Sequence, residues 1–291
     1  MYKPDELQSL LEQQQYIMDE AQAFTVSISL QLEKPLLVEG PAGVGKTELA
    51  KGLASVLDAP LIRLQCYEGL GEEKALYEWN YSKQLLHIQA DKHQSWQELS
   101  TDIFSEEYLL ERPLLQSIRN GQQTVLLIDE LDRVDEEFEA FLLELLSDFQ
   151  ITIPEMGAIQ AQQKPVVVLT SNATRELSEA LRRRCIYLYM DFPTPERERD
   201  IILKRIPGIE PTLAQQVVHT VQRLREHELK KSPSISETLD WARALQNLGI
   251  TELDEQTLTQ TSNVLLKHKS DLQQMTQIEN LVSDDHEHRA A

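Results

Sequence analysis

Short apolar runs alternate with amphipathic stretches over the first two thirds of the chain. The amphipathic stretches have apolar positions three and four residues apart, which is typical of a helix buried on one side. The runs between them are short and apolar throughout, which is typical of strands in a parallel sheet covered by helices. The predicted strands are residues 35–39, 61–65, 125–128, 166–170 and 186–190. We therefore expect an α/β domain with a five-stranded parallel sheet flanked by helices.

The same pattern predicts the helices and one hairpin. Expected helices cover residues 48–57, 104–120, 136–147 and 176–184. Pro113 should mark a kink or a boundary in the second of them, because proline removes a helical hydrogen bond. Residues 149–153 alternate apolar and polar up to a turn signal at 154–157, so a β-hairpin is expected there.

Three aromatic residues follow an acidic, glycine-containing turn at residues 68–73. Tyr77, Trp79 and Tyr81 lie two residues apart, so an extended backbone would place all three rings on one face. Such a face either grips a partner polypeptide or packs against the domain core. The sequence leaves both interpretations open.

The last third of the chain carries helical periodicity without strand signals. Residues 192–195 are rich in proline and mark the expected domain boundary. Expected helices cover residues 195–206, 212–229, 236–248 and 254–267, the third of them capped by Ser236. We therefore predict an α/β domain at 1–192, whose N-terminal helices cover one edge of the sheet, a small all-α lid domain at 193–270, and a polar tail at 271–291.

Composition narrows the class of protein. The 291 residues are 41% hydrophobic, carry a net charge of −20, and include only two cysteines, which suits a reducing cytosol. No apolar run is long enough to span a bilayer, and residues 1–20 lack the pattern of a signal peptide, so a cytoplasmic protein is expected. An overall anion is repelled by a phosphate backbone, which disfavours nucleic acid as a partner.

A glycine-rich stretch between the first predicted strand and the following helix carries the first chemical signal. Gly40, Pro41, Ala42, Gly43, Val44, Gly45, Lys46 and Thr47 match the phosphate-binding pattern G-x-x-x-x-G-K-[ST], and Glu48 follows it. In this loop, backbone N–H groups surround the phosphates, the lysine reaches the β- and γ-phosphates, and the Thr47 hydroxyl binds Mg²⁺. The flanking strand and helix place a helix N-terminus at the phosphates. The chain is therefore predicted to bind ATP with Mg²⁺.

Polar residues at the ends of two later strands complete the predicted site. Asp129 and Glu130 directly follow the apolar run at 125–128, where open α/β sheets bind their ligands. Asp129 is expected to hold Mg²⁺, and Glu130 to orient and deprotonate the attacking water. Asn172 follows the next strand and is expected to contact the γ-phosphate or that water. Asp132 is expected to be structural.

Three adjacent arginines, Arg182, Arg183 and Arg184, end the helix before the last strand. At least one of them suits a helix C-terminus, whose dipole favours cations. A nucleic-acid patch is a second interpretation, which the net charge of −20 disfavours. The third is an arginine finger, a guanidinium that reaches the nucleotide of a neighbouring subunit and accelerates hydrolysis.

In the order and the residue sequence of these motifs, the chain resembles the AAA+ ATPases and, more narrowly, the MoxR type. Residues 36–54, 77–84, 125–154 and 166–188 look like the CoxD-like branch, which is associated with carbon monoxide dehydrogenase maturation. The resemblance covers residues 30–270. It implies Walker A at 40–47, Walker B at 129–130, the first sensor at Asn172, and an arginine finger at Arg184 or else Arg183.

The resemblance also implies a biological setting. Such proteins work as rings of six and remodel protein clients, so a homo-oligomer, a client such as a molybdenum-type metalloenzyme, and a partner with a von Willebrand factor A domain are expected. One position departs from the family pattern: Thr238 stands where a second-sensor arginine is expected, and Arg243 is the candidate substitute. A nucleic-acid motor or clamp-loader-like ATPase and a nucleotide-gated scaffold that hardly hydrolyses ATP are the alternatives.

Overall fold

A computed structural model describes residues 2–90 and 103–282 of the chain. Within this part the chain divides into two units, each with its own hydrophobic core. Unit 1 comprises Met1–Gln14, Met18–Glu39 and Thr47–Tyr189, and unit 2 comprises Gln15–Ile17, Gly40–Lys46 and Met190–Ala291. The domain limits at residues 192 and 270 stay a prediction.

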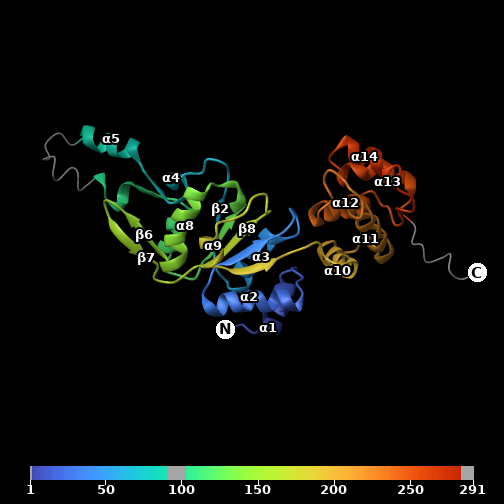
Figure 1. Ribbon diagram of the computed structural model, residues 1–291, viewed down its shortest axis with the longest axis horizontal. Coiled ribbons are helices and arrows are strands. Elements are labelled where there is room, and N and C mark those ends of the chain that lie inside the picture. The colour runs from blue at the N-terminus through green and yellow to red at the C-terminus, as the bar shows by residue number, and fades with distance from the viewer. Residues whose placement is uncertain (1, 91–102, 283–291) are drawn as a thin grey trace, which may run out of the picture. The chain divides into compact units, whose positions relative to one another are not determined.

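Unit 1 is built on a five-stranded parallel sheet, which confirms the expected fold class (Figure 1). Its strands are β1 (Leu36–Glu39), β2 (Leu61–Gln65), β5 (Val125–Asp129), β8 (Val166–Ser171) and β9 (Ile186–Tyr189). They lie in the order β2-β5-β8-β1-β9, and every neighbouring pair is parallel. Every residue of β1 and β5 is buried, which explains why these strands appear in the sequence as unbroken apolar runs.

Helices connect the strands of unit 1 and cover the sheet. They are α1 (Pro4–Gln13), α2 (Glu20–Leu32), α3 (Lys46–Val56), α4 (Glu72–Ala75), α5 (Tyr81–Ala90), α7 (Pro113–Arg119), α8 (Glu136–Asp148) and α9 (Glu179–Arg182). The α2 helix lies against the edge strand β9, as expected of the N-terminal helices, and α7 lies against β2 and β5. The N-terminus of α8 is fixed by Asp135, whose carboxylate accepts a hydrogen bond from the Phe138 N–H.

The helix expected over residues 104–120 begins only at Pro113, so that prediction is wrong for its first half. The preceding residues form a 3₁₀ turn (Glu106–Tyr108) and β4 (Leu109–Glu111), which pairs antiparallel with β3 (Tyr77–Trp79). Proline favours the first position of a helix, where no N–H is needed, and therefore starts α7 rather than kinking it.

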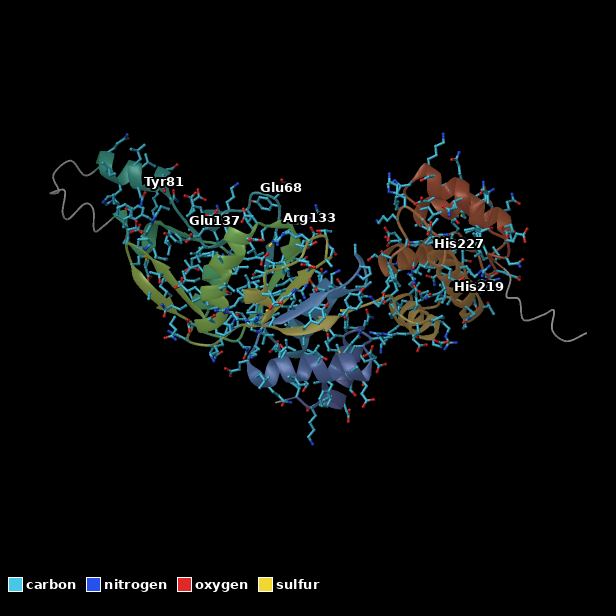
Figure 2. The ribbon with its side chains drawn as sticks, in the orientation of Figure 1. Glu68, Tyr81, Arg133, Glu137, His219 and His227 are labelled. Atoms are coloured by element: carbon cyan, nitrogen blue, oxygen red, sulfur yellow. The ribbon has the colours of Figure 1, made fainter. Side chains whose placement is uncertain are left out.

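The three aromatic residues do not share one face. Tyr77 and Trp79 belong to β3, and Trp79 is buried with its ring edge-on to Phe104 at a centroid distance of 5.3 Å. Tyr81 is instead the first residue of α5 and is 64% exposed (Figure 2). Core packing therefore accounts for Trp79, and the expectation of a three-ring face is wrong because the backbone turns helical after Asn80.

The two segments that follow β5 agree with the expectation in part. The hairpin is confirmed as β6 (Gln150–Ile153) and β7 (Gly157–Gln160), which pair antiparallel. The helix expected over residues 176–184 is only the four-residue α9. It begins after Ser178, whose hydroxyl caps its N-terminus by accepting a hydrogen bond from the Leu181 N–H.

Unit 2 contains the helices of the C-terminal third. They are α10 (Pro195–Arg205), α11 (Pro211–Arg225), α12 (Ile235–Asn247), α13 (Glu255–Thr261) and α14 (Lys269–Met275). The cap of α12 is Ser234 rather than the expected Ser236, because Ser234 and Glu237 hydrogen-bond each other's backbone N–H. The α14 helix crosses the start of the segment expected to be a polar tail, where Met275 and Leu281 are buried in the core of unit 2.

Trp241 is the largest side chain in the core of unit 2. It is fully buried, and its indole N–H donates to the Thr261 hydroxyl at 2.8 Å. We expect Trp241→Ala to lower the free energy of unfolding by about 3 kcal/mol, because it leaves a large cavity. Guanidinium unfolding followed by circular dichroism measures this loss. The control Leu248→Ala removes a side chain that is 66% exposed and should cost much less; equal losses in the two variants would contradict the packing argument.

Candidate active site

The carboxyl ends of the parallel strands bring the candidate residues of unit 1 to one edge of the sheet. Asp129, the last residue of β5, is in register with Gln65 of β2. Ser171 of β8 is in register with Glu39 of β1, which is also in register with Tyr189 of β9. Buried polar side chains therefore lie at the ends of three neighbouring central strands: Glu39 of β1, Asp129 of β5, and Thr170 with Ser171 of β8.

Asp129 is the centre of this edge. Its carboxylate is 4% exposed and accepts hydrogen bonds from two hydroxyls: that of Thr47 at 3.1 Å, and that of Thr170 at 2.5 Å. It also forms an ion pair with Arg63 of β2. Thr47 and Asp129, each expected to bind Mg²⁺, thus lie in contact, since the first turn of α3 and the end of β5 converge here. Hydroxyl and carboxylate oxygens are the ligands that Mg²⁺ prefers, so these two side chains fit the expected metal.

Glu130 follows Asp129 in an uncommon backbone conformation. Its φ is 58°, a left-handed value that is rare for residues other than glycine. Its N–H donates to the Thr170 hydroxyl at 2.9 Å, which holds the turn in place. The Glu130 carboxylate is half-buried, and its closest ionic neighbour is Arg133 at 3.9 Å. A weakly paired carboxylate that still meets solvent suits a group that accepts a proton from water.

Asp132 and Asn172 form a structural contact behind this edge. The buried Asp132 carboxylate accepts from the N–H groups of Asn172 and Thr174 at 3.1 Å, and from the Thr174 hydroxyl. Burial would raise the pKa of Asp132, but these hydrogen bonds outweigh it and keep the pKa below its ordinary value. Asp132 therefore holds the loop that carries Asn172, as expected of a structural acid.

The glycine-rich loop connects β1 to α3 and has the backbone its sequence predicts. Gly43 and Gly45 have φ of 77° and 101°, which other residues rarely adopt. At Gly40 an added Cβ would lie 1.9 Å from the Met190 carbonyl oxygen, so only glycine fits. The buried Lys46 ammonium donates to the carbonyl oxygens of Gly40 and Pro41, both at 2.7 Å. The lysine is thus held against its own loop.

The strand edge around Asp129 carries a negative electrostatic field. Cys66, the residue after β2, has a pKa raised to about 12, first by burial and then by the charges of Asp129, Asp132 and Glu130. In the described part of the chain no three His, Cys, Asp or Glu side chains are grouped to hold a metal ion. A cation attracted to this edge must therefore take further ligands from elsewhere, such as the phosphates of a nucleotide.

The arginine cluster separates into three different environments. Arg182 donates to both carboxylate oxygens of the buried Glu39 at 2.9 Å, so its charge is used within its own subunit. Arg183 is exposed and pairs with Glu179 at 3.2 Å. Arg184 is half-buried and donates to the Ser147 hydroxyl at 2.6 Å and the Ala180 carbonyl at 3.0 Å. Because this ion pair holds Arg182 within its own chain, Arg182 is not a candidate for the arginine finger.

Thr238 of unit 2 is part of a buried ionic cluster. Its hydroxyl donates to Glu198 at 3.0 Å, and Arg225 binds both oxygens of the same carboxylate at 2.7 and 2.8 Å. Thr238 and Glu198 are fully buried. Thr238 therefore stabilises unit 2 and offers no group to a phosphate, whereas Arg243 is exposed on α12. That Arg243 takes the place of the second-sensor arginine stays a prediction.

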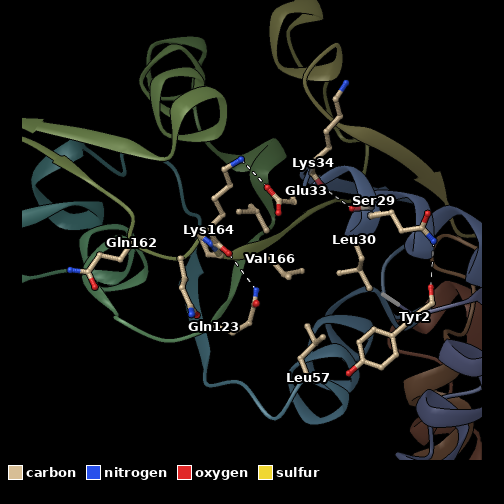
Figure 3. A pocket seen from close by; sticks show the side chains of 14 residues that line it. Tyr2, Ser29, Leu30, Glu33, Lys34, Leu57, Gln123, Gln162, Lys164 and Val166 are labelled. Atoms are coloured by element: carbon tan, nitrogen blue, oxygen red, sulfur yellow. Dashed lines mark hydrogen bonds and ion pairs between the residues drawn. The ribbon is translucent and has the colours of Figure 1, made fainter.

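A separate hollow in unit 1 lies at the opposite edge of the sheet. This cavity of about 460 Å³ is lined by residues that precede or begin strands, including Gln123 before β5, Lys164 before β8 and Lys34 before β1 (Figure 3). An ion pair between Lys164 and Glu33 at 2.8 Å crosses its lining. In parallel sheets ligands bind at the carboxyl ends of strands, so this hollow is not the site that the motifs define.

Sequence reasoning missed three side chains of the site. Thr170 was assigned only to a strand. Its hydroxyl follows four apolar residues, just as the Asp129 carboxylate does, and this shared position could have indicated a site residue. Glu39 likewise ends an apolar run directly before the glycine loop. Arg63 gave no signal, because an arginine within an alternating edge strand is ordinarily solvated. The structure alone connects it to Asp129.

Comparison with known proteins identifies a family. A family model described as "ATPase family associated with various cellular activities (AAA)" matches residues 36–192. An uncharacterised protein of Staphylococcus epidermidis is 27% identical over 226 residues, which cover 75% of this chain and 78% of that protein. The denitrification regulatory protein NirQ of Pseudomonas aeruginosa is 24% identical over 210 residues, or 69% and 72% of the two chains.

Solved structures agree on the fold. A RuvB variant of Thermotoga maritima superposes with a TM-score of 0.53 at 20% identity and covers 90% of this chain and 72% of its own. No helix in the described part of the chain is long and apolar enough to cross a membrane. The AAA model spans more than half of the 291 residues, and its match contains the glycine loop, Asp129, Glu130 and Asn172. This chain therefore belongs to the AAA family of ATPases.

Proposed function

We propose that this protein binds ATP with Mg²⁺, hydrolyses it in an oligomeric ring, and uses the turnover to remodel or activate a protein client. The observation that carries the proposal is the cluster in which Asp129 binds the Thr47 and Thr170 hydroxyls, while the next residue, Glu130, has a half-buried carboxylate whose ionic neighbour is Arg133 at 3.9 Å. Two carboxylates side by side with different surroundings suit two roles, one holding a cation and one accepting a proton.

The residues divide the chemistry between them. The N–H groups of the glycine loop and the Lys46 ammonium would bind the phosphates, and Thr47 with Asp129 would hold Mg²⁺, which would neutralise phosphate charge. Glu130 orients a water molecule and takes its proton, while Asn172 fixes the water or the γ-phosphate. Arg184, or else Arg183, reaches the nucleotide of the neighbouring subunit.

The setting of the proposal is that of the MoxR type. We expect a cytoplasmic homo-oligomer, a hexamer, that acts with a protein carrying a von Willebrand factor A domain on a metalloenzyme client. The similarity to a protein named as a denitrification regulatory protein supports a regulatory role. The net charge of −20 weighs against a nucleic-acid motor.

Phosphate release by the purified protein tests the proposal. We expect multiple turnovers with ATP and Mg²⁺, none in excess EDTA, and no stimulation by single- or double-stranded DNA. Stimulation by DNA that falls steeply with salt would instead support the nucleic-acid motor. Binding without multiple turnovers would support the nucleotide-gated scaffold and contradict hydrolysis.

Lys46→Ala tests the phosphate-binding loop directly. Because the lysine forms charge-assisted hydrogen bonds with phosphate oxygens, its loss should weaken ATP binding about 10- to 100-fold. Fluorescence titration with a labelled ATP analogue measures the dissociation constant. Lys51→Ala is the matched control, because Lys51 lies on the same helix α3, is 53% exposed and pairs with Glu48 at 2.6 Å. Unchanged affinity in Lys46→Ala would overturn the proposed site.

A further inference from the structure

Arg63 occupies a position for which the proposed chemistry has no role. It lies in the middle of β2, its side chain is 48% exposed, and its guanidinium forms an ion pair with the Asp129 carboxylate, which is 5% exposed. The same terminal nitrogen donates to the side-chain carbonyl of Gln65, two residues further along the strand on the same face. The guanidinium is therefore held at Asp129 from the edge strand of the sheet.

The partners of Asp129 explain why a cation is needed there. A buried carboxylate without a positive partner is costly, and two hydroxyl donors supply hydrogen bonds but no charge. Lys46 donates to the carbonyl oxygens of its own loop. The remaining ionisable neighbours, Glu130, Asp132 and Cys66, add negative charge or none. Among the contacts described for Asp129, Arg63 is the positive one.

We propose that Arg63 is a placeholder for the metal: its guanidinium neutralises Asp129 in the nucleotide-free protein and is displaced from the carboxylate when Mg²⁺ enters with the nucleotide. The proposal rests on the proposed function of Asp129. It follows from competition, because the Arg63 guanidinium and Mg²⁺ would both need the carboxylate oxygens of Asp129. The exposed position of Arg63 lets the side chain leave into solvent at little cost. Arg63 is then a positioning residue that sets how much Mg²⁺ the protein needs.

The test measures Mg²⁺ dependence in binding rather than in turnover. A fluorescent ADP analogue is titrated into Arg63→Gln and the unaltered protein at a series of free Mg²⁺ concentrations. We expect the Mg²⁺ concentration for half-maximal binding to fall about two- to tenfold in Arg63→Gln, since a competing cation is gone. Arg63→Lys retains the charge and should keep the original value.

A control and a second measurement separate this role from an ordinary structural ion pair. Arg112→Gln removes the same charge from an arginine of similar exposure that pairs with Glu78, and it should not change the Mg²⁺ requirement. Thermal unfolding should show Arg63→Gln melting below the unaltered protein in EDTA, with the difference shrinking in saturating Mg²⁺ and ADP. A structural tie would give the same difference in both conditions, which would overturn the proposal.

The two proposals fail in different ways. If the unaltered protein binds no ADP at any Mg²⁺ concentration, the proposed function is wrong, and the placeholder role falls with it. If it binds ADP in an Mg²⁺-dependent manner while Arg63→Gln has an unchanged or higher Mg²⁺ requirement, only the role of Arg63 is overturned.

Discussion

Arg184→Ala is expected to retain ATP binding and lose about 10³-fold or more in the rate of hydrolysis. An arginine that neutralises the transferred phosphoryl group from a neighbouring subunit is worth that much in rate. Within its own chain the side chain loses only its hydrogen bonds to Ser147 and the Ala180 carbonyl, each of which contributes about 1 kcal/mol to stability. Phosphate release and nucleotide titration on the same preparation measure the two quantities.

Subunit mixing distinguishes a residue that acts across an interface from one that acts in its own site. Arg184→Ala subunits have an intact nucleotide site, and Lys46→Ala subunits retain Arg184, so mixed oligomers should recover part of the activity. Arg183→Ala is the matched control, because Arg183 is exposed and pairs with Glu179, four residues earlier. A large loss of hydrolysis in Arg183→Ala with none in Arg184→Ala would assign the arginine finger to Arg183 instead. Full activity of a monomer at all dilutions would overturn both.

The sheet and its chemistry were predictable because they depend on local patterns. Each central strand is buried and begins with an unbroken apolar run, and each candidate acid follows such a run directly. The glycine loop is recognisable because Gly43 and Gly45 need backbone angles that other residues avoid. Parallel strands then bring their carboxyl ends to one edge, which places Asp129 and Thr47 in contact.

The errors arose where the outcome depends on tertiary contacts. Residues 104–112 contain apolar positions that suit a helix, but Leu109 pairs with Trp79 in a small antiparallel sheet. Tyr81 follows the spacing of a strand, yet it starts a helix. Ser234 and Ser236 are both suitable caps by residue type, and only the reciprocal bonds between Ser234 and Glu237 decide between them.

The site itself shows the same limit for charged residues. The three arginines at 182–184 look alike in the sequence, and their roles separate only when the buried Glu39 takes Arg182. Arg63 was unremarkable until β2 was placed beside β5. A pairing of charges between strands far apart in sequence depends on strand order, which hydrophobic periodicity does not determine.

Glu130→Gln should bind ATP normally and hydrolyse it about 10²- to 10⁴-fold more slowly, because glutamine retains the shape of the side chain but cannot take a proton from water. The N–H bond to Thr170 that fixes this residue involves only its backbone, so the fold should not change. The control Glu137→Gln alters an exposed acid on α8 and should retain full activity.

Because the stalled protein keeps its nucleotide, it should also retain its client. Mass spectrometry of the proteins that co-purify with Glu130→Gln from its own host identifies that client. Normal turnover in Glu130→Gln would remove the carboxylate from the mechanism, and recovery of DNA in place of a protein would favour the nucleic-acid motor.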